Sequence, residues 1–150
     1  MSEKKQLFPV FEMPKIVNFE PSEEKKYKAS LYFDFEQGDF CRDGAGKLLT
    51  CEGKEAWKQW CIKAVLTERF TCLAYSHDFG AEMYGALAQS DKEAVESGIR
   101  TTIIETLKVN PRTEYVRGFQ FFWTGEGIEV NFTVKGKEWE EQQVSLNLSR

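Results

Sequence analysis

Four cysteines and one histidine are the residues of this 150-residue chain best suited to nucleophilic or metal chemistry. The cysteines stand at Cys41, Cys51, Cys61 and Cys72, and no two of them form a C-x-x-C pair. Zinc sites usually take two ligands from one turn, because a close pair lowers the entropy lost when the site closes. The spacing therefore predicts buried free thiols and no metal site. A nucleophilic cysteine paired with His77 is the alternative chemistry for these residues.

Other enzyme motifs are absent from the sequence. It contains no G-x-x-x-x-G-K-[ST] phosphate loop and no G-x-S-x-G elbow, and a single histidine cannot supply an H-E-x-x-H zinc helix. Paired carboxylates such as Asp34 and Glu36 alternate with apolar residues, which is typical of the solvated side of a strand. We therefore expect no catalytic residues, no cofactor and no enzymatic activity.

Composition excludes several further classes of protein. Acidic residues outnumber basic residues by 24 to 20, which argues against a dedicated nucleic-acid binder. The 41% of hydrophobic residues suffice for one core, but no run approaches the roughly 20 apolar residues of a membrane helix. The N-terminus lacks the apolar segment of a secretory signal. We expect a soluble intracellular domain that contacts neither nucleic acid nor membrane.

The chain is predicted to divide into an N-terminal arm, residues 1–28, and a single domain, residues 29–150. The arm holds three of the four prolines, yet Phe8, Phe11 and Phe19 make it too apolar for a plain solvated tail. It therefore packs either on its own domain or on a neighbouring protein, and the sequence favours neither alternative.

The first part of the domain is predicted to contain a strand, a hairpin and a helix. Leu31, Phe33 and Phe35 alternate with polar residues as in a half-buried strand, and residues 43–46 form a turn. From Lys54 the apolar residues recur at helical spacing, to about residue 69. The stripe that this helix should bury consists of Ala56, Trp57, Trp60, Cys61, Ala64 and Val65.

A second helix is predicted to begin at a capping box, with Ser90 as the N-cap and Glu93 reaching back to its amide. Glu96 and Arg100 are expected to form an exposed ion pair on it. The proline at position 111 should end the helix, because it disfavours helical backbone in the preceding residue. The expected buried positions are Val95, Ile99, Ile103 and Leu107.

Strands are predicted for the rest of the chain. A turn at residues 125–127 joins two of them in a hairpin, whose inward sides are expected to carry Tyr115, Phe119, Phe121 and Trp123 on the first strand and Ile128, Val130, Phe132 and Val134 on the second. Val144, Leu146 and Leu148 then alternate with polar residues in a C-terminal strand. That strand pairs either with its own sheet or with the sheet of a neighbour.

This order of elements indicates an α+β fold. Helices that are segregated from antiparallel hairpins usually cover one face of the sheet. We expect an antiparallel sheet of hairpins packed against two main helices, with an extended N-terminal arm and a C-terminal strand.

Four segments of the sequence, in matching order, resemble the baseplate wedge, or sheath-initiator, family of contractile phage tails. They are residues 32–40, 66–70, 75–80 and 110–112. Within them lie the residues Arg69, Tyr75, Asp78, Asn110, Pro111 and Arg112. The chain is similar to the version of the family found in defective prophages and in phage-tail-like bacteriocins of Gram-positive bacteria.

The resemblance implies a structural, non-catalytic component of a baseplate. Family members lie at the tube base in sixfold arrangement, contact wedge and tube-base proteins, and start the sheath by exchanging strands with sheath subunits. The implied location is the cytoplasm of the producing bacterium and later the released particle, a phage tail or a bacteriocin. A non-catalytic regulatory adaptor on the same fold is the alternative function.

The resemblance also assigns partner-binding residues. The family's Pro-Arg motif, here Pro111 and Arg112, faces the helical bundle of the wedge proteins, and many relatives have an acidic residue where this chain has Asn110. Residues of the other matching segments, Arg69, Tyr75 and Asp78, are expected at the same interfaces. Strand exchange would use the rib of Val144, Leu146 and Leu148, whose main chain supplies affinity and whose side chains set the register. The direction of the exchange is left open.

Overall fold

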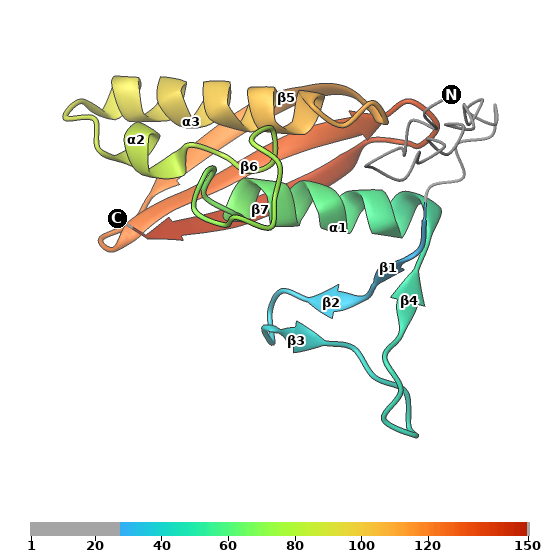
Figure 1. The fold of residues 1–150 in the computed structure, drawn as a ribbon. Coiled ribbons are helices and arrows are strands. Elements are labelled where there is room, and N and C mark those ends of the chain that lie inside the picture. Colours follow the sequence, from blue (N-terminus) through green and yellow to red (C-terminus); the bar gives the residue numbers. More distant parts are fainter. Residues whose placement is uncertain (1–27, 150) are drawn as a thin grey trace, which may run out of the picture.

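The computed structural model describes residues 28–149, so the predicted arm lies outside the described residues except for Lys28. Ten elements follow one another along these residues (Figure 1). They are β1 (Ser30–Leu31), β2 (Phe33–Asp34), β3 (Asp39–Phe40), β4 (Thr50–Cys51), α1 (Gly53–Leu66), α2 (Met83–Leu87), α3 (Lys92–Lys108), β5 (Thr113–Trp123), β6 (Gly127–Gly136) and β7 (Gln142–Ser149). None of these helices is long and apolar enough to cross a membrane.

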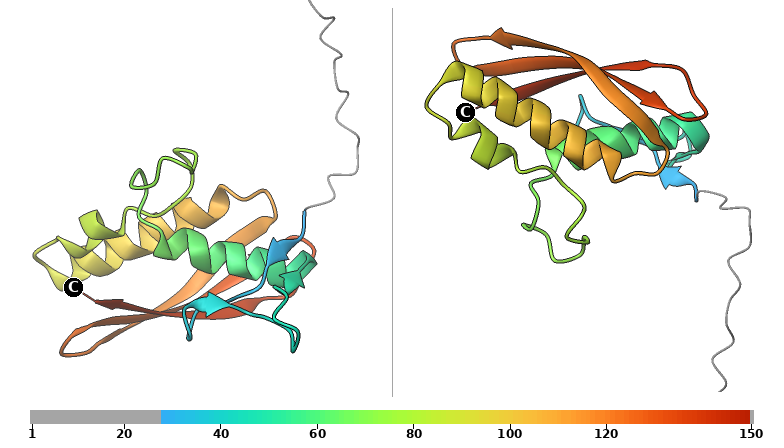
Figure 2. Two further views of the ribbon diagram at one scale, coloured as in Figure 1. Left: turned by 60° about the horizontal axis from the view of Figure 1, so that its bottom comes forward. Right: turned by 90° about the horizontal axis from the view of Figure 1, so that it is seen from above.

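The body of the molecule has two layers. Strands β5, β6 and β7 form an antiparallel sheet in that order, and α1 and α3 cover one face of it (Figures 1 and 2). The short helix α2 lies beside α3, and Gly98 allows this approach because a Cβ there would lie 3.2 Å from the Cβ of Ala86. The α+β fold with two main helices, antiparallel hairpins and a C-terminal strand is confirmed.

The core lies between the two layers, where the predicted apolar stripes meet. Every expected position on α3 is buried, and so is each expected position on α1 except Trp60, which packs against the cluster from its edge. Helix α1 ends at Leu66, three residues earlier than expected. Thr67 has extended backbone, and both its N–H and its hydroxyl donate to the Lys63 carbonyl. The extended backbone of Thr67 ends the helix, and its two hydrogen bonds satisfy one carbonyl of the last turn.

The predicted N-terminus of α3 is wrong by one residue. Asp91, rather than Ser90, is the N-cap, and its Oδ2 accepts a hydrogen bond from the Ala94 amide at 3.3 Å. Serine and aspartate are both good N-caps, so the sequence offers two candidates in succession. The carboxylate also places a negative charge at the positive end of the helix dipole, which favours it over the hydroxyl.

The expected exposed ion pair between Glu96 and Arg100 is also wrong. Glu96 Oε1 accepts a hydrogen bond from Trp123 Nε1 at 2.8 Å. The Arg100 guanidinium lies 5.8 Å from the ring centre of Phe119 and 5.7 Å from that of Phe121. Both side chains thus turn toward β5, where aromatic rings offer contacts that the helix surface lacks.

Tyr115 does not share a face with the other aromatic residues of β5, contrary to the prediction. Val116 is buried in its place, opposite Val134 of β6. One extra residue lies in β5 between Arg117 and Gln120, where Gly118 has φ +69°. Such a bulge shifts the alternation of side chains by one, so simple period-two reasoning fails across it.

Residues 28–52 form an extension that projects from the body beside α1 (Figure 1). The expected half-buried strand is present only in two pieces, β1 and β2, which pair with β4 and β3, and Phe33 and Phe35 are half-buried as predicted. Leu31 is exposed, contrary to the prediction, because these two-stranded ladders lie apart from the three-stranded sheet. The predicted turn at residues 43–46 is present and is closed by a hydrogen bond from the Asp43 amide to the Lys47 carbonyl. Gln59 of α1 holds the extension through both backbone groups of Phe33.

Candidate functional site

Asn110 and Arg112 form one polar unit just beyond α3. The buried Asn110 Oδ1 accepts hydrogen bonds from the Arg112 backbone amide at 3.0 Å and from its Nε at 3.3 Å. The Lys137 amide donates to the Arg112 carbonyl at 2.8 Å. Arg112 is therefore half-buried and held in one orientation. An amide oxygen supplies here the acceptor that an acidic residue would offer, without adding a charge.

A small hollow of about 40 Å³ borders this unit. It is lined by Pro111, Arg112, Lys137, Glu138 and Trp139, so two cationic side chains face a single acidic one. One side of the hollow is held by core packing, because Trp139 packs on the buried Trp57 with ring centres 5.3 Å apart. The arrangement suits contact with a polar or acidic group of another protein.

The cysteines occupy different environments, and one lies under this unit. Burial raises the pKa of the Cys61 thiol to about 12, although the Arg112 cation opposes the rise. A thiol that stays protonated is a poor nucleophile. Cys51 is buried as predicted, whereas Cys72 is exposed and Cys41 is intermediate, so the prediction of buried thiols fails for these two. Within residues 28–149, no three His, Cys, Asp or Glu side chains gather as a metal site would require.

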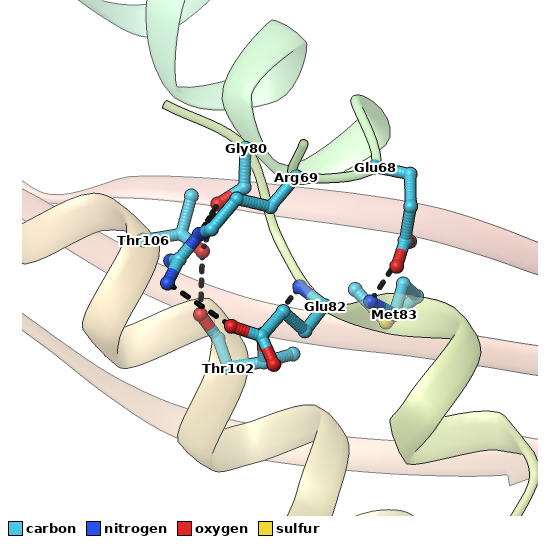
Figure 3. A network of polar contacts seen from close by, with 7 residues as sticks. All are labelled: Glu68, Arg69, Gly80, Glu82, Met83, Thr102 and Thr106. Atoms are coloured by element: carbon cyan, nitrogen blue, oxygen red, sulfur yellow. Dashed lines mark hydrogen bonds and ion pairs between the residues drawn. The ribbon is translucent and has the colours of Figure 1, made fainter. Parts of the chain in front are cut away.

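Arg69 fastens the base of the loop between α1 and α2 (Figure 3). Its Nε donates to the Gly80 carbonyl at 3.0 Å, and its Nη1 lies 3.2 Å from Glu82 Oε1. The Arg69 amide donates to the Ala81 carbonyl, and the Ala81 amide donates to the Thr67 carbonyl, both at 2.9 Å. The Arg69 side chain is only 16% exposed, so its ion pair is partly shielded from water. Arg69 thus closes the loop from within the chain, and a partner contact through it stays a prediction.

Helix α3 supports the same loop from the other side. The buried Thr106 hydroxyl donates to the Gly80 carbonyl at 3.0 Å, and the Thr102 hydroxyl accepts from the Glu82 amide at 2.9 Å (Figure 3). A Cβ at Gly80, where φ is +107°, would lie 2.9 Å from the Thr67 carbonyl oxygen. Glycine is therefore required at this point for both backbone conformation and space.

Glu68 is a residue of this network that the sequence analysis missed. Its Oε2 accepts from the amide of Met83 at 3.0 Å (Figure 3) and from that of Tyr84 at 3.2 Å, and these are the first two residues of α2. These amides have no partner within the helix, so Glu68 caps α2 from a distance. The cap spans 15 residues of sequence, and no local pattern of the kind used for Ser90 reveals it.

Tyr75 and Asp78 lie further along the loop. The Tyr75 ring lies 4.5 Å from Phe79, whose ring contacts Trp60 of α1 at 5.8 Å. The Lys63 ammonium lies 4.8 Å above the Tyr75 ring. Asp78 is exposed. Tyr75 therefore folds the loop back onto α1, while Asp78 faces solvent.

The third group of predicted residues lies on β7. Val144, Leu146 and Leu148 are buried, with exposed fractions of 4%, 4% and 9%, and they pair opposite Phe132, Val130 and Ile128 of β6. The eight β6–β7 pairs follow one another without a register shift. The structure thus makes β7 an integral strand of the sheet, and its side chains belong to the core.

The outward edge of β7 can be assigned from the β5–β6 turn. The Thr124 amide donates to the Gly127 carbonyl, which makes these two residues a hydrogen-bonded pair. Such pairs alternate along antiparallel strands, so Glu129 and Asn131 of β6 bond toward β5, and Val130 and its core-facing neighbours bond toward β7. On β7, the residues whose backbone groups point away from β6 are Gln143, Ser145, Asn147 and Ser149, all of them exposed.

The predicted residues thus occupy three places rather than one. Asn110, Pro111 and Arg112 lie at the end of α3, Arg69, Tyr75 and Asp78 lie in the loop between α1 and α2, and the apolar rib lies on β7. The sequence analysis did not identify the outward-pointing backbone groups of Ser145 and Asn147. They could have been predicted, because the turn at residues 125–127 fixes which residues of each strand bond to which neighbour.

The comparisons with known proteins agree with this architecture. No curated protein matches the sequence. The family of contractile injection system sheath initiators matches residues 29–138, which covers the extension, all three helices, β5 and β6 and ends before β7. A match over most of the chain, together with the α+β fold, establishes the relationship: the chain belongs to the contractile injection system sheath-initiator family.

Proposed function

We propose that this sheath initiator starts sheath polymerisation by receiving a strand of a sheath subunit at the free edge of β7. The observation that carries the proposal is the character of that edge. It runs for eight residues in unbroken register and contains no charged residue. Proteins normally blunt such an edge with charges, prolines or bulges, because it is a template for another strand.

The burial of the β7 side chains favours receiving a strand over donating one. If β7 left its sheet for that of a sheath subunit, the side chains of Ile128, Val130 and Phe132 would lose the partners that now cover them. An added strand next to β7 leaves this core intact and uses the outward backbone groups of Ser145 and Asn147.

The substitution Ser145→Pro tests the proposal with a single change to the free edge of β7. Proline removes the outward amide of this exposed residue but none of the hydrogen bonds between β7 and β6. We expect the Ser145→Pro protein to remain folded and to enter baseplates, while sheath fails to grow on them in electron micrographs. Ser145→Ala is the matched control, since it keeps the amide and should permit sheath growth. Normal sheaths on baseplates that carry Ser145→Pro would refute the proposal.

The second part of the proposal is that Arg112 joins the protein to the wedge proteins at the tube base. Support comes from the family resemblance of the Asn110-Pro111-Arg112 triplet and from the fixed orientation of Arg112. Asn110 limits the freedom of the guanidinium before a partner arrives, which lowers the entropy cost of binding. The bordering hollow carries the positive charge that an acidic or carbonyl-rich helix bundle would meet.

Arg112→Ala should separate this role from folding. The variant keeps the backbone amide that donates to Asn110, so we expect a change in unfolding free energy within about 1 kcal/mol. Baseplate assembly should nevertheless fail or weaken. Arg112→Lys keeps the charge without the planar fork and should restore assembly only in part. Normal assembly with a strongly destabilised Arg112→Ala protein would make the residue structural instead.

The proposal describes a non-catalytic component of an injection particle. In the particle the protein would lie in sixfold arrangement, contact tube-base proteins, and be assembled in the cytoplasm of the producing bacterium before the phage tail or bacteriocin is released. Two features support the absence of catalysis: burial raises the pKa of the Cys61 thiol, and the hydrogen bonds of Arg69 and Arg112 hold the backbone in place. Purified protein should release no peptidoglycan fragments above a heat-inactivated control, and metal analysis should find no stoichiometric zinc.

A further inference from the structure

The loop between α1 and α2 carries an uncharged, apolar tip. Residues 70–77 contain no Asp, Glu, Lys or Arg, although such residues make up 29% of the chain. Leu73 is 103% exposed and therefore lies wholly in solvent, and Phe70 is 65% exposed. Large apolar side chains that are exposed together commonly mark an interaction surface.

The tip is presented by a firmly held base. Arg69 and the backbone of Ala81 close the two ends of the loop, and Tyr75 and Phe79 pack it against Trp60 of α1. A loop that is ordered before binding loses little conformational entropy when a partner arrives. The exposure of Phe70 and Leu73 is therefore a fixed feature of the fold.

The backbone of Phe70 adds an independent indication. Its φ is +67°, and Phe70 is the only residue other than glycine with positive φ among residues 28–149. The left-handed region is unfavourable for a bulky aromatic residue, and glycine or asparagine would occupy it at lower cost. Its ring lies 5.8 Å from the ring of exposed His77. Strain of this kind is characteristic of residues whose side chain is needed for binding.

We propose that Phe70 and Leu73 insert into an uncharged apolar recess on a baseplate protein. This docking surface is separate from the β7 edge, because the loop contacts α1, α2 and α3 and extends from the helix layer away from the sheet (Figure 2). The lack of charge at the tip matches an uncharged recess, since a charged partner surface would be desolvated without compensation. The inference rests on the proposed function only in placing the recess within the particle.

Two substitutions test the docking, and Phe70→Gly is the sharper one. Glycine accepts φ +67° without strain, so the melting temperature of Phe70→Gly should not fall, although the side chain is lost. Leu73→Ser should leave the melting temperature unchanged, because Leu73 is fully exposed. The control is Phe122→Ser, which removes a half-exposed aromatic side chain of β5.

Binding is measured by adding purified full-length protein to baseplates from a producing strain that lacks it. Phe70→Gly and Leu73→Ser should each bind about tenfold more weakly than the unaltered protein, as expected for buried apolar anchors, and Phe122→Ser should bind normally. Sheath growth on baseplates saturated with either variant should be normal, whereas Ser145→Pro should bind normally and block growth. The experiment can therefore refute docking through the loop without refuting strand addition at β7, and the reverse also holds.

Three results would overturn the inference. The first is unchanged binding of both loop variants. The second is a clear loss of melting temperature in Phe70→Gly, which would make the side chain a structural element. The third is cosedimentation of the protein with phosphatidylcholine–phosphatidylglycerol vesicles that Leu73→Ser abolishes, because the tip would then be a membrane anchor.

Discussion

The two edges of the three-stranded sheet are built in opposite ways. Strand β5 contains two register shifts, one between Thr113 and Tyr115 and one between Arg117 and Gln120. It carries charged side chains, and Arg117 and Glu114 are engaged with Glu141 and Lys135. Strand β7 has neither feature, since its pairing with β6 is regular and its eight residues are uncharged.

The contrast indicates that only one edge is closed to further strands. Bulges twist an edge away from a partner, and charges oppose the approach of another strand. Both devices would be equally useful on β7 if the chain acted alone. Their restriction to β5 within one sheet supports the proposal that the sheath contact is at β7.

Removal of β7 should have the largest effect, and it should act on folding. Truncation after Gly136 deletes the buried side chains of Val144, Leu146 and Leu148, at about 2 kcal/mol for each. This sum is comparable with the whole stability of a typical domain. We expect loss of the cooperative thermal transition in circular dichroism. A truncated protein that melts normally would mean that β7 is dispensable for the fold and free to leave it.

Charges placed on the two edges should have unequal effects. Ser145→Lys with Asn147→Lys gives β7 the protection that β5 already has, and sheath addition should weaken about tenfold. The matched pair on β5, Gln120→Lys with Phe122→Lys, adds the same charge to exposed positions of the same face and should leave sheath addition unchanged. Sedimentation of sheath with baseplates measures both. Equal losses from the two pairs would contradict the assignment to β7.

Gly118→Ala should separate the stability of the β5 edge from the function of the β7 edge. Alanine at φ +69° costs about 1 kcal/mol of unfolding free energy, while its Cβ meets only Thr133 at ordinary contact distance. We expect a lower denaturation midpoint and normal sheath addition below it. Impaired addition by folded protein would show that the bulge shapes the binding surface.

The charged cluster near the start of β5 should produce a small acid sensitivity. The pKa of the Glu141 carboxyl is lowered, mainly by a hydrogen bond from the Tyr115 hydroxyl and further by the Arg117 cation. Because the folded pKa is the lower one, this stabilisation is present above the ordinary carboxyl pKa and is lost as pH falls through the folded value. Glu141→Gln should therefore flatten the acid limb of the stability profile slightly, since the group is exposed. An unchanged profile would mean that the cluster contributes nothing to stability.

The parts of the fold that the sequence predicts are those in which apolar residues repeat at regular spacing. The buried stripes of α1 and α3 and the alternation of β6 are strong repeating signals, and they were correctly predicted. Prediction failed where one residue broke the repeat or where the partner layer was missing. The bulge at Gly118 placed Tyr115 on the outer face, and Leu31 is exposed because the short ladders of the extension lie apart from the three-stranded sheet.

The candidate site was less predictable, because its contacts are distant in sequence or involve the main chain. The resemblance located Arg112, but only the structure reveals that Asn110 orients it. The capping of α2 by Glu68 and the left-handed backbone of Phe70 have no local signature. The outward amide of Ser145 could have been assigned in advance, since the register of a hairpin follows from its turn.

A cryo-electron microscopy map of the assembled particle, resolved well enough to trace strands, would show whether a sheath strand lies beside β7. We expect a strand of a sheath subunit beside β7, paired with the backbone of Gln143, Ser145 and Asn147, so that the sheet order becomes β5-β6-β7-sheath. A map in which β7 borders solvent, or in which the sheath strand lies against β5, would contradict this expectation.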